Sequence, residues 1–454
     1  MSNSATNTST RDVVFNTVSI INSVTEAAKP LTGLWNAINI YENIFDSTVT
    51  GTIELKDGIN LYAEMALHGQ EYLYLSFNRP GENEKTTRYE RAFRIFKVAE
   101  KEPTENQIQS YVIHFCSEEL IFSNQVTISK SLRGKVISDY VYSICTRDLR
   151  ISNRKIDLLN NFEWSVGVQD FIIPSLHPLD AIQMLAQNAF SGSLSPFMFF
   201  ENNQGWNFLS LEAMFARTPL TTLNYSNAKI TEDISTAAFK NANQMSKMKF
   251  RNSFDMLRNT QRMTYSGKLY TLDLLRQRYE KNDFSVDKLA PSNFIDGKNI
   301  PINNSTNRNE KSLTQEYGTK LFYHITNKGQ TNTPYLTSRG FRVTDTNIES
   351  SLMQRESLLN LLNNTVLECT VPGNVLFTVG NIVEIEMPSF ASNAQNMRNI
   401  DPYLSGRYLI TAVRHTLVPS GGHQTRLIVN KNSLSSPLDR ADQTSSNYRK
   451  MRNL

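Results

Sequence analysis

The chain has 454 residues, enough for about three domains, and its apolar fraction of 39% and mean hydropathy of −0.39 are typical of a soluble protein. No apolar run approaches the ~20 residues of a membrane span, and residues 1–10 lack the basic start and apolar core of a secretory signal, so we expect neither. The net charge of +4 argues against a dedicated nucleic-acid binder, and the one tight basic cluster in the sequence, Arg449-Lys450 with Arg452, lies in the tail.

The three cysteines, Cys116, Cys145 and Cys369, are odd in number and widely separated. This arrangement fits reduced, buried thiols better than a disulfide framework or a metal cluster. We therefore predict no metal site and no cofactor, and synthesis in a cytoplasm.

Residues 1–38 are expected to form an N-terminal arm, as either an amphipathic helix or an extended segment. A first β-rich domain follows over residues 39–149. Runs of β-branched and aromatic residues predict strands at 48–55, 61–66, 72–77, 92–98 and 110–116, with turn residues between them. Apolar residues at helical spacing predict a short closing helix over about 134–146.

A middle α+β domain is predicted over residues 150–239. Pro178 suits the first position of a helix, Asp180 lies in the first turn, where the helix dipole favours an acid, and Ile182 and Leu185 belong to an apolar stripe. These features predict a helix within 174–190. Apolar runs at 197–200 and 206–209 predict a hairpin, and a helix is expected at 211–217.

A second β-rich domain is predicted over residues 240–284 and 349–435, followed by a tail at 436–454. We expect a short helix near 254–260, strands within 263–274 and a helix at 349–362. The intervening residues 285–348 are polar, rich in turn residues and show only a weak strand signal at 321–325. A structureless loop of that length is uncommon inside a compact domain, so we interpret this segment as an insertion.

The stretch 367–432 reads as a β-meander. Val383, Ile385 and Met387 alternate with Glu384 and Glu386, so a strand there has one apolar face and one acidic face. A β-rich run at 406–417, turn residues at 419–422 and a returning run at 425–429 predict a hairpin.

Several residue groups resemble catalytic patterns, but each has a simpler structural explanation. Ser175, His177 and Asp180 are close only in sequence, whereas a catalytic triad is assembled in space, so we interpret them as a helix start. The acid pairs Glu118-Glu119 and Glu384 with Glu386 could supply the two carboxylates of a glycoside hydrolase, yet a solvated strand shows the same alternation as the second pair.

Two further patterns are incomplete as ligand sites. His114 and Cys116 share a strand face, but zinc requires about four ligands and no second pair has the right spacing. Gly421-Gly422 lacks the Lys-Ser/Thr that follows in a phosphate loop. We therefore predict that the protein is not an enzyme.

Several short segments, in this order, resemble the baseplate hub proteins of contractile-tailed bacteriophages, the family typified by the spike-bearing hub of the T-even phages. They lie at residues 41–45, 49–53, 57–58, 68–72, 115–120, 173–174, 177–182, 199–208 and 406–410. Residues 1–35 and 285–348 carry no such resemblance.

The resemblance implies two tube-like β-barrel modules in each chain, with short helices, flanking a small α+β domain. Three chains would form a homotrimeric ring of six modules, adapting the six-fold tail tube to the three-fold central spike. The implied partners are further copies of the chain, the spike, tail tube or tube-initiator proteins and surrounding baseplate wedge proteins. DNA would pass through without specific binding, in a virion assembled in the host bacterial cytoplasm.

The acidic face of the 382–387 strand leads us to expect Glu384 and Glu386 to face the lumen of this ring, where their charge would disfavour phosphate contact. Two alternatives remain open. The chain could be the hub of a related contractile injection or secretion machine, or a tail-associated cell-wall hydrolase.

Overall fold

A computed structural model describes residues 13–65, 67–78, 88–103, 108–152, 156, 160–225, 243–274, 277–302, 312–315, 321–326, 335–337, 340–342, 348–388, 400–419 and 422–438. Strands predominate among these residues, with short helices between them, so the predicted β-rich α+β fold class is confirmed.

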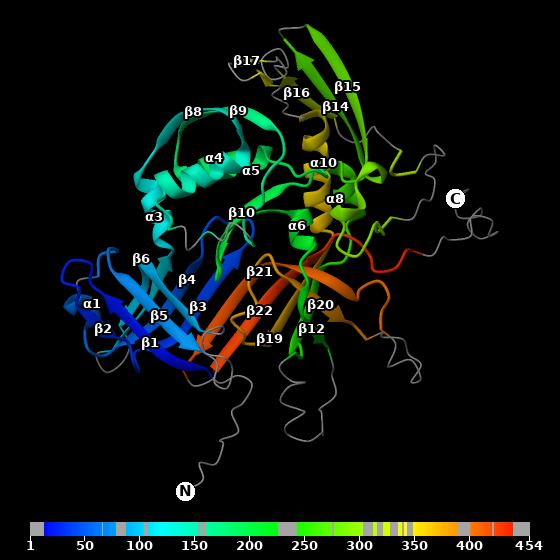
Figure 1. The fold of residues 1–454 in the computed structure, drawn as a ribbon. Coiled ribbons are helices and arrows are strands. Elements are labelled where there is room, and N and C mark those ends of the chain that lie inside the picture. Colours follow the sequence, from blue (N-terminus) through cyan, green and yellow to red (C-terminus); the bar gives the residue numbers. More distant parts are fainter. Residues whose placement is uncertain are drawn as a thin grey trace.

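One sheet of thirteen strands runs through two strand sets (Figure 1). The first set consists of β1 (Val14–Ile21), β2 (Ala28–Pro30), β3 (Trp35–Asn43), β4 (Thr50–Asp57), β5 (Tyr72–Asn78), β6 (Tyr89–Pro103) and β7 (Gln109–Cys116). The second set consists of β12 (Pro219–Asn224), β13 (Lys247–Asn252), β19 (Thr365–Pro372), β20 (Ile382–Glu386), β21 (Gly406–Val418) and β22 (Gly422–Lys431).

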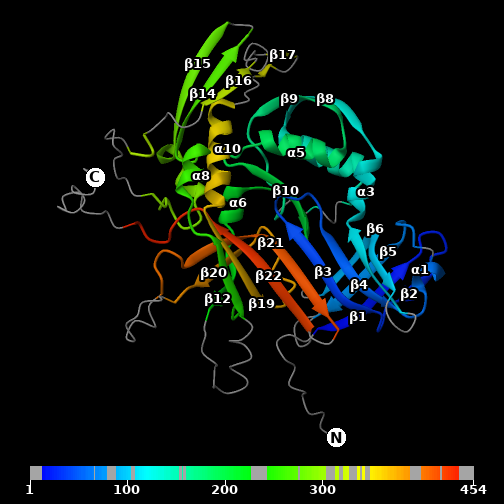
Figure 2. The same cartoon turned by 180° about the vertical axis from the view of Figure 1, so that it is seen from behind.

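The two sets meet where β3 pairs with β21 in antiparallel register, from Ile38 opposite Leu417 to Asn43 opposite Ala412. We call this pairing the seam. Strands from the two ends of the chain therefore lie side by side, as the blue and orange ribbons show from the front and from behind (Figures 1 and 2). The sheet is continuous across both sets.

Each strand set buries an apolar core of its own. Ile53 and Phe115 have no exposed surface in the first core, and Ile410 and Val429 have none in the second. Gly51 on β4 makes the first core possible, because a Cβ atom there would overlap the Phe115 ring.

Most of a third unit of helices and hairpins lies above the first strand set in Figure 1, whereas its last helix, α6 (Leu211–Phe215), lies above the second. The unit consists of α3 (Glu118–Gln125), β8 (Ile128–Val136), α4 (Ile137–Ser143), a π-helix (Ile144–Asp148), β9 (Val168–Leu176), α5 (Pro178–Asn188), β10 (Phe197–Asn202), β11 (Gly205–Ser210) and α6. Its core is aromatic: the Trp206 ring stacks on Phe199 with centroids 5.3 Å apart. The predicted helix at Pro178 and the hairpin after it are confirmed.

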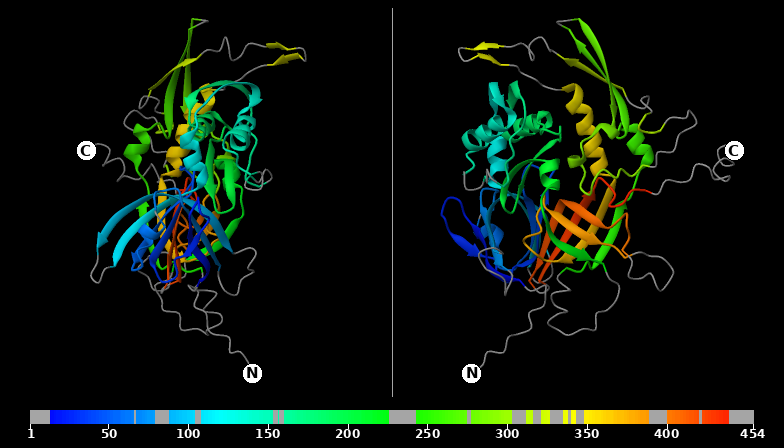
Figure 3. Two further views of the ribbon diagram at one scale, coloured as in Figure 1. Left: turned by 90° about the vertical axis from the view of Figure 1, so that its left-hand side faces the viewer. Right: turned by 45° about the vertical axis from the view of Figure 1, so that its right-hand side comes forward.

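A projecting three-stranded sheet, β14 (Ser266–Asp273), β15 (Arg278–Ser285) and β16 (Leu321–Thr326), extends beyond helix α10 (Ile348–Leu362) in Figure 3. Other elements are α8 (Met256–Gln261), 3-10 turns at Val286–Lys288 and Pro291–Asn293, and the pair β17 (Tyr335–Thr337) with β18 (Gly340–Arg342). The weak strand signal at 321–325 and the helix at 349–362 are confirmed by β16 and α10.

The predicted strand at 61–66 is wrong. Residues Leu61–Glu64 form a single helical turn, α1, because Asp57 accepts hydrogen bonds from the backbone N–H groups of Ile59, Leu61 and Tyr62. These bonds satisfy amide groups that a helix start leaves without partners. The apolar residues of this segment match the pattern of a strand, but the hydrogen bonds to the preceding Asp57 stabilise a helical turn instead.

Two further expectations are refined. Of the two alternatives for the N-terminal arm, the described residues adopt the extended one and not the helix, since Val14–Ile21 form strand β1, which pairs with β5. The expected helix over 134–146 begins only at Ile137, because residues 128–136 belong to β8, which pairs with β9. Neither β8 nor β9 was predicted. The tail cluster at 449–452 and residues 420–421 of the expected turn lie outside the described residues.

Candidate functional site

The predicted alternation on β20 is confirmed at the level of burial. Val383 and Ile385 have no exposed surface and Met387 has 1%, whereas Glu384 and Glu386 are exposed. Strand β20 lies between β12 and β21, and the Thr222 hydroxyl donates a hydrogen bond of 3.4 Å to Glu384 Oε2. Both carboxylates therefore stand on the solvent side of a well-packed strand.

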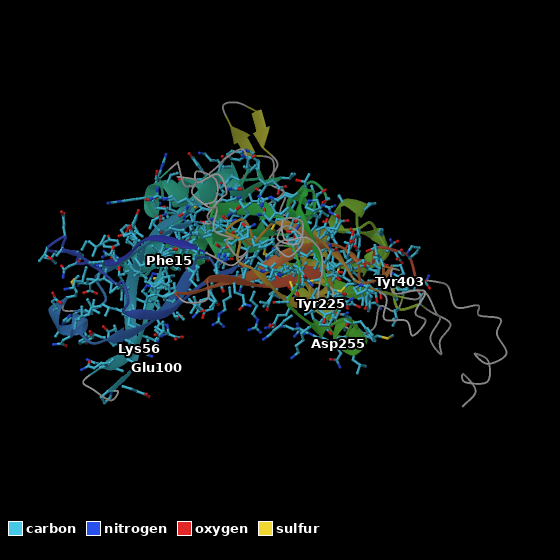
Figure 4. The ribbon with its side chains drawn as sticks, turned by 90° about the horizontal axis from the view of Figure 1, so that it is seen from below. Phe15, Lys56, Glu100, Tyr225, Asp255 and Tyr403 are labelled. Carbon is cyan, nitrogen blue, oxygen red and sulfur yellow. The ribbon has the colours of Figure 1, made fainter. Side chains whose placement is uncertain are left out.

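A group of basic side chains lies on the exposed face of the second strand set. Lys247, Lys249 and Arg251 project from β13, Arg414 from β21 and Arg426 from β22. We call these five side chains the basic face. In the view from below, Lys56 and Glu100 mark the side of the first strand set, and Tyr225 and Asp255 mark the side of the second (Figure 4).

Strand register brings these residues together from distant parts of the chain. Lys247 lies opposite Thr370 of β19, Thr370 lies opposite Arg426 of β22, and Arg426 lies opposite Arg414 of β21. Four of the five basic side chains line a shallow groove of about 700 Å³, together with neutral polar residues, Tyr225, Met248 and the acidic Glu368. No sequence signal marked this groove, because its strands are far apart in the chain.

A buried polar junction fastens the third unit to the first strand set. Glu201 on β10 accepts hydrogen bonds from the Val49 amide (3.0 Å) and the Ser117 hydroxyl, and it forms an ion pair with Arg91 of β6. Arg91 also donates to the Asn202 carbonyl at 3.3 Å. The Glu201 side chain is 1% exposed, so these protein groups take the place of water around it.

A second buried carboxylate ties the two strand sets together beside the seam. Glu42 on β3 accepts hydrogen bonds from the Thr378 hydroxyl and from the Val379 amide (3.2 Å), both in the segment between β19 and β20. Burial raises the pKa of Glu42 to about 7, although these hydrogen bonds oppose the rise. Asn202 reaches the same segment by donating to the Val379 carbonyl at 3.1 Å.

Of the three residues that resembled a catalytic triad, His177 and Asp180 start a helix, as predicted, whereas Ser175 lies in strand β9. His177 is the N-cap position of α5, and its Nδ1 lies 3.0 Å from the Val126 carbonyl. Asp180 lies in the first turn of the helix, and Ser123 accepts a hydrogen bond from the Leu179 amide at 3.1 Å. These contacts hold α5 against α3.

The other candidate residues also have structural partners. Glu118 accepts a hydrogen bond from the Tyr72 hydroxyl at 2.6 Å and lies 3.5 Å from Arg94. Cys116 is buried on β7 and burial raises its pKa to about 12, so its thiol stays protonated near neutral pH. All three cysteines are free and buried, which confirms the prediction of reduced, buried thiols. Among the described residues, no three His, Cys, Asp or Glu side chains are grouped as metal ligands.

Comparison with known proteins finds similarity in structure but not in sequence. No protein-family model and no curated protein matches this sequence. The structure is similar to that of a tail protein from Neisseria meningitidis, with a TM-score of 0.50, 10% identity, and coverage of 93% of this chain and 97% of that one. It is equally similar to the 43 kDa tail protein of prophage MuSo2 from Shewanella oneidensis, with a TM-score of 0.50, 10% identity and coverage of 93% and 100%.

The chain has the fold of phage tail proteins. This likeness extends over nearly the whole of both neighbours, so it includes the two strand sets and the unit between them. It confirms, at the level of fold, the resemblance that the sequence segments indicated. Among the described helices of this tail-protein fold, none is both long and apolar enough to cross a membrane.

Proposed function

We propose that this chain is the structural hub of a phage tail baseplate and assembles as a ring of three copies. The seam is the observation that carries the proposal. It places two β-rich modules side by side in one chain, so three chains would supply six modules while keeping three-fold symmetry. Such a ring could meet a six-fold tail tube on one side and a three-fold spike on the other.

The ends of the sheet suit such an assembly. Along the described strand order, β13 ends the sheet on one side and β2 on the other, although Gln244, just before β13, forms a bridge with Asn224 of β12. An unpaired strand edge tends to associate with a neighbouring chain, and a closed ring covers it. The proposed partners are the spike, the tail tube or its initiator and the baseplate wedge proteins, with DNA passing through during ejection and assembly taking place in the host cytoplasm.

Light scattering of the purified chain over a range of concentrations, followed by electron microscopy, tests the ring. We expect the mass of three copies and a three-fold particle with a central opening. A stable dimer or tetramer would contradict the proposal. If the chain alone is a monomer, the measurement is repeated after co-expression with the spike, and a monomer in that preparation also contradicts it.

We further propose that Glu384 and Glu386 face the lumen of this ring. The support is their exposure on β20, beside the fully buried Val383 and Ile385. Carboxylates at that position would weaken phosphate contacts during passage of DNA. A reconstruction of the ring that places both carboxylates on its outer wall would end this part of the proposal.

The proposed role is mechanical and not enzymatic. The acid pair Glu384 and Glu386 lies on the exposed face of β20, and the other acid pair, Glu118 with Glu119, lies in the first turn of α3. Clearing of a peptidoglycan suspension by the purified chain, and its loss in the Glu384→Gln/Glu386→Gln variant, would favour the hydrolase instead.

A further inference from the structure

The basic face has far more positive than negative charge within reach. Arg251 Nε lies 2.6 Å from Glu368, and Arg426 forms an ion pair with the same carboxylate. Two guanidinium groups therefore share one negative charge. The side chains of Arg251 and Arg426 remain 48% and 46% exposed, so both can still meet a ligand.

The other three basic side chains form no ion pair with a described residue, although Lys249 lies directly opposite Glu368 in the register of β13 and β19. Lys247 and Lys249 are exposed on β13, and no described carboxylate lies within salt-bridge distance of either. Arg414 donates two hydrogen bonds, of 3.1 and 3.0 Å, to the neutral side-chain oxygen of Asn39. Among its described lining residues, the groove therefore has four basic side chains and a single carboxylate, that of Glu368.

The chemistry of the groove indicates what kind of partner it fits. Protein–protein interfaces usually have an apolar centre, whereas nucleic-acid interfaces are more polar and much more positive. The lining here is mainly charged and polar, with residues such as Ser246, Thr370, Thr416 and Gln424 between the cations. Lys247 and Lys249 point the same way from one strand, roughly 7 Å apart along it.

We propose that the basic face binds the phosphate backbone of duplex DNA without sequence preference. The groove is shallow and lined by side chains from neighbouring strands of one sheet, which suits a contact with the DNA backbone. Its described lining residues include no helix that could enter a DNA groove to read bases. Binding of this kind depends strongly on salt. The proposal does not depend on ring formation, because one chain presents all five side chains.

The test is fluorescence anisotropy of a labelled duplex titrated with the full chain at several salt concentrations. The Lys247→Glu/Lys249→Glu variant should bind at least about tenfold more weakly than the natural chain. The milder Lys247→Gln/Lys249→Gln variant should lower the slope of log affinity against log salt by about 2, since each lost phosphate contact removes about 0.9. If the charge reversal prevents folding, the glutamine variant carries the test.

Two controls separate the basic face from general charge. Lys281→Glu/Lys288→Glu makes the same charge change at exposed positions on and just after β15 and should alter affinity less than twofold. Replacing Arg449, Lys450 and Arg452 by alanine removes the tail cluster and should leave the effect of the β13 lysines intact. Equal weakening by the β15 control, or unchanged binding after loss of Lys247 and Lys249, would overturn the proposal. Polyglutamate that competes as well as duplex DNA would also overturn it, in favour of an acidic polypeptide.

Discussion

Arg91 on β6 and Glu201 on β10 form a buried ion pair between residues 110 positions apart in the chain. It is the central contact of the junction that fastens the third unit to the first strand set. A buried charge without its partner is costly, because the protein interior solvates it poorly. We therefore expect a change at this junction to have a large effect on the free energy of unfolding.

We expect Glu201→Gln to lower the free energy of unfolding by about 3–5 kcal/mol, because Arg91 would stay largely buried without its ion-pair partner. Urea unfolding measures this change. Glu118→Gln is the matched control, since Glu118 also pairs with an arginine of β6 but is 52% exposed, and it should cost less than about 1 kcal/mol. Equal losses in the two variants would mean that burial of the Arg91–Glu201 pair is not what matters.

The raised pKa of Glu42 should be visible in how the stability of the protein depends on pH. Burial raises its pKa from 4.5 to about 7, so the folded protein holds a proton that the unfolded chain releases between these values. The resulting stability is fully present below pH 4.5 and is lost as pH rises through about 7. Glu42→Gln should remove this loss, so its stability relative to the natural chain should rise by roughly 3 kcal/mol across that window.

His415 contributes with the opposite sign over nearly the same pH range. Burial lowers its pKa to about 4, so the stability that it confers is present above pH 6.5 and is lost as pH falls through about 4. In the natural chain these two pH-dependent contributions to stability partly cancel, so a plot of its stability against pH shows less change than either group causes alone. Unfolding by denaturant at several pH values, taken as the difference between Glu42→Gln and the natural chain, isolates Glu42. A difference that stays constant with pH would contradict the raised pKa.

Gly51→Ala should destabilise the first strand set by about 1–3 kcal/mol, because the new Cβ atom would overlap the Phe115 ring and lie 2.5 Å from the Asn39 carbonyl. Thermal unfolding measures the effect. Gly192→Ala is the control, since no atom lies within 4 Å of the position that its new methyl group would occupy. If the Gly51→Ala protein is as stable as the Gly192→Ala protein, the Phe115 ring and the Asn39 carbonyl must move aside for the new methyl group without a cost in stability, which would contradict this prediction.

Lys431 should be a further stability determinant. Its ammonium lies 2.7 Å from Asp296 and donates to the Ser405 carbonyl at 2.6 Å, and the side chain is 1% exposed. Lys431→Met keeps much of the volume but leaves Asp296 without its cation, so we expect a loss of about 3–5 kcal/mol in urea unfolding. Lys281→Met, at an exposed position, should change stability by less than about 0.5 kcal/mol.

Local features with their own physical cause could be predicted from sequence. Pro178 and Asp180 correctly predicted where α5 starts. The alternation around Glu384 correctly predicted which side chains of β20 are exposed and which are buried. In both cases the deciding interactions lie within a few residues of one another. The failure at residues 61–66 had a local cause too, since the capping role of Asp57 outweighed the apolar pattern.

Features that depend on distant pairing could not be predicted. Glu201 was assigned to the turn of a hairpin, and nothing near it in sequence indicates Arg91 or Ser117. The basic face needs the register of β13, β19, β22 and β21, whose lysines and arginines are single residues within ordinary strand patterns. The net charge of +4 for the whole chain also carries no information about the local excess of positive charge on this face.

The seam also makes the two halves of the molecule depend on each other for folding. Strand β3 has β4 on one side and β21 on the other, so neither strand set can form its complete sheet without the other. A fragment carrying only one set would display the backbone of β3 or β21 as an open edge and would tend to aggregate. Intact chains should therefore unfold both sets in one cooperative transition, and a break in the polypeptide between them need not release either half.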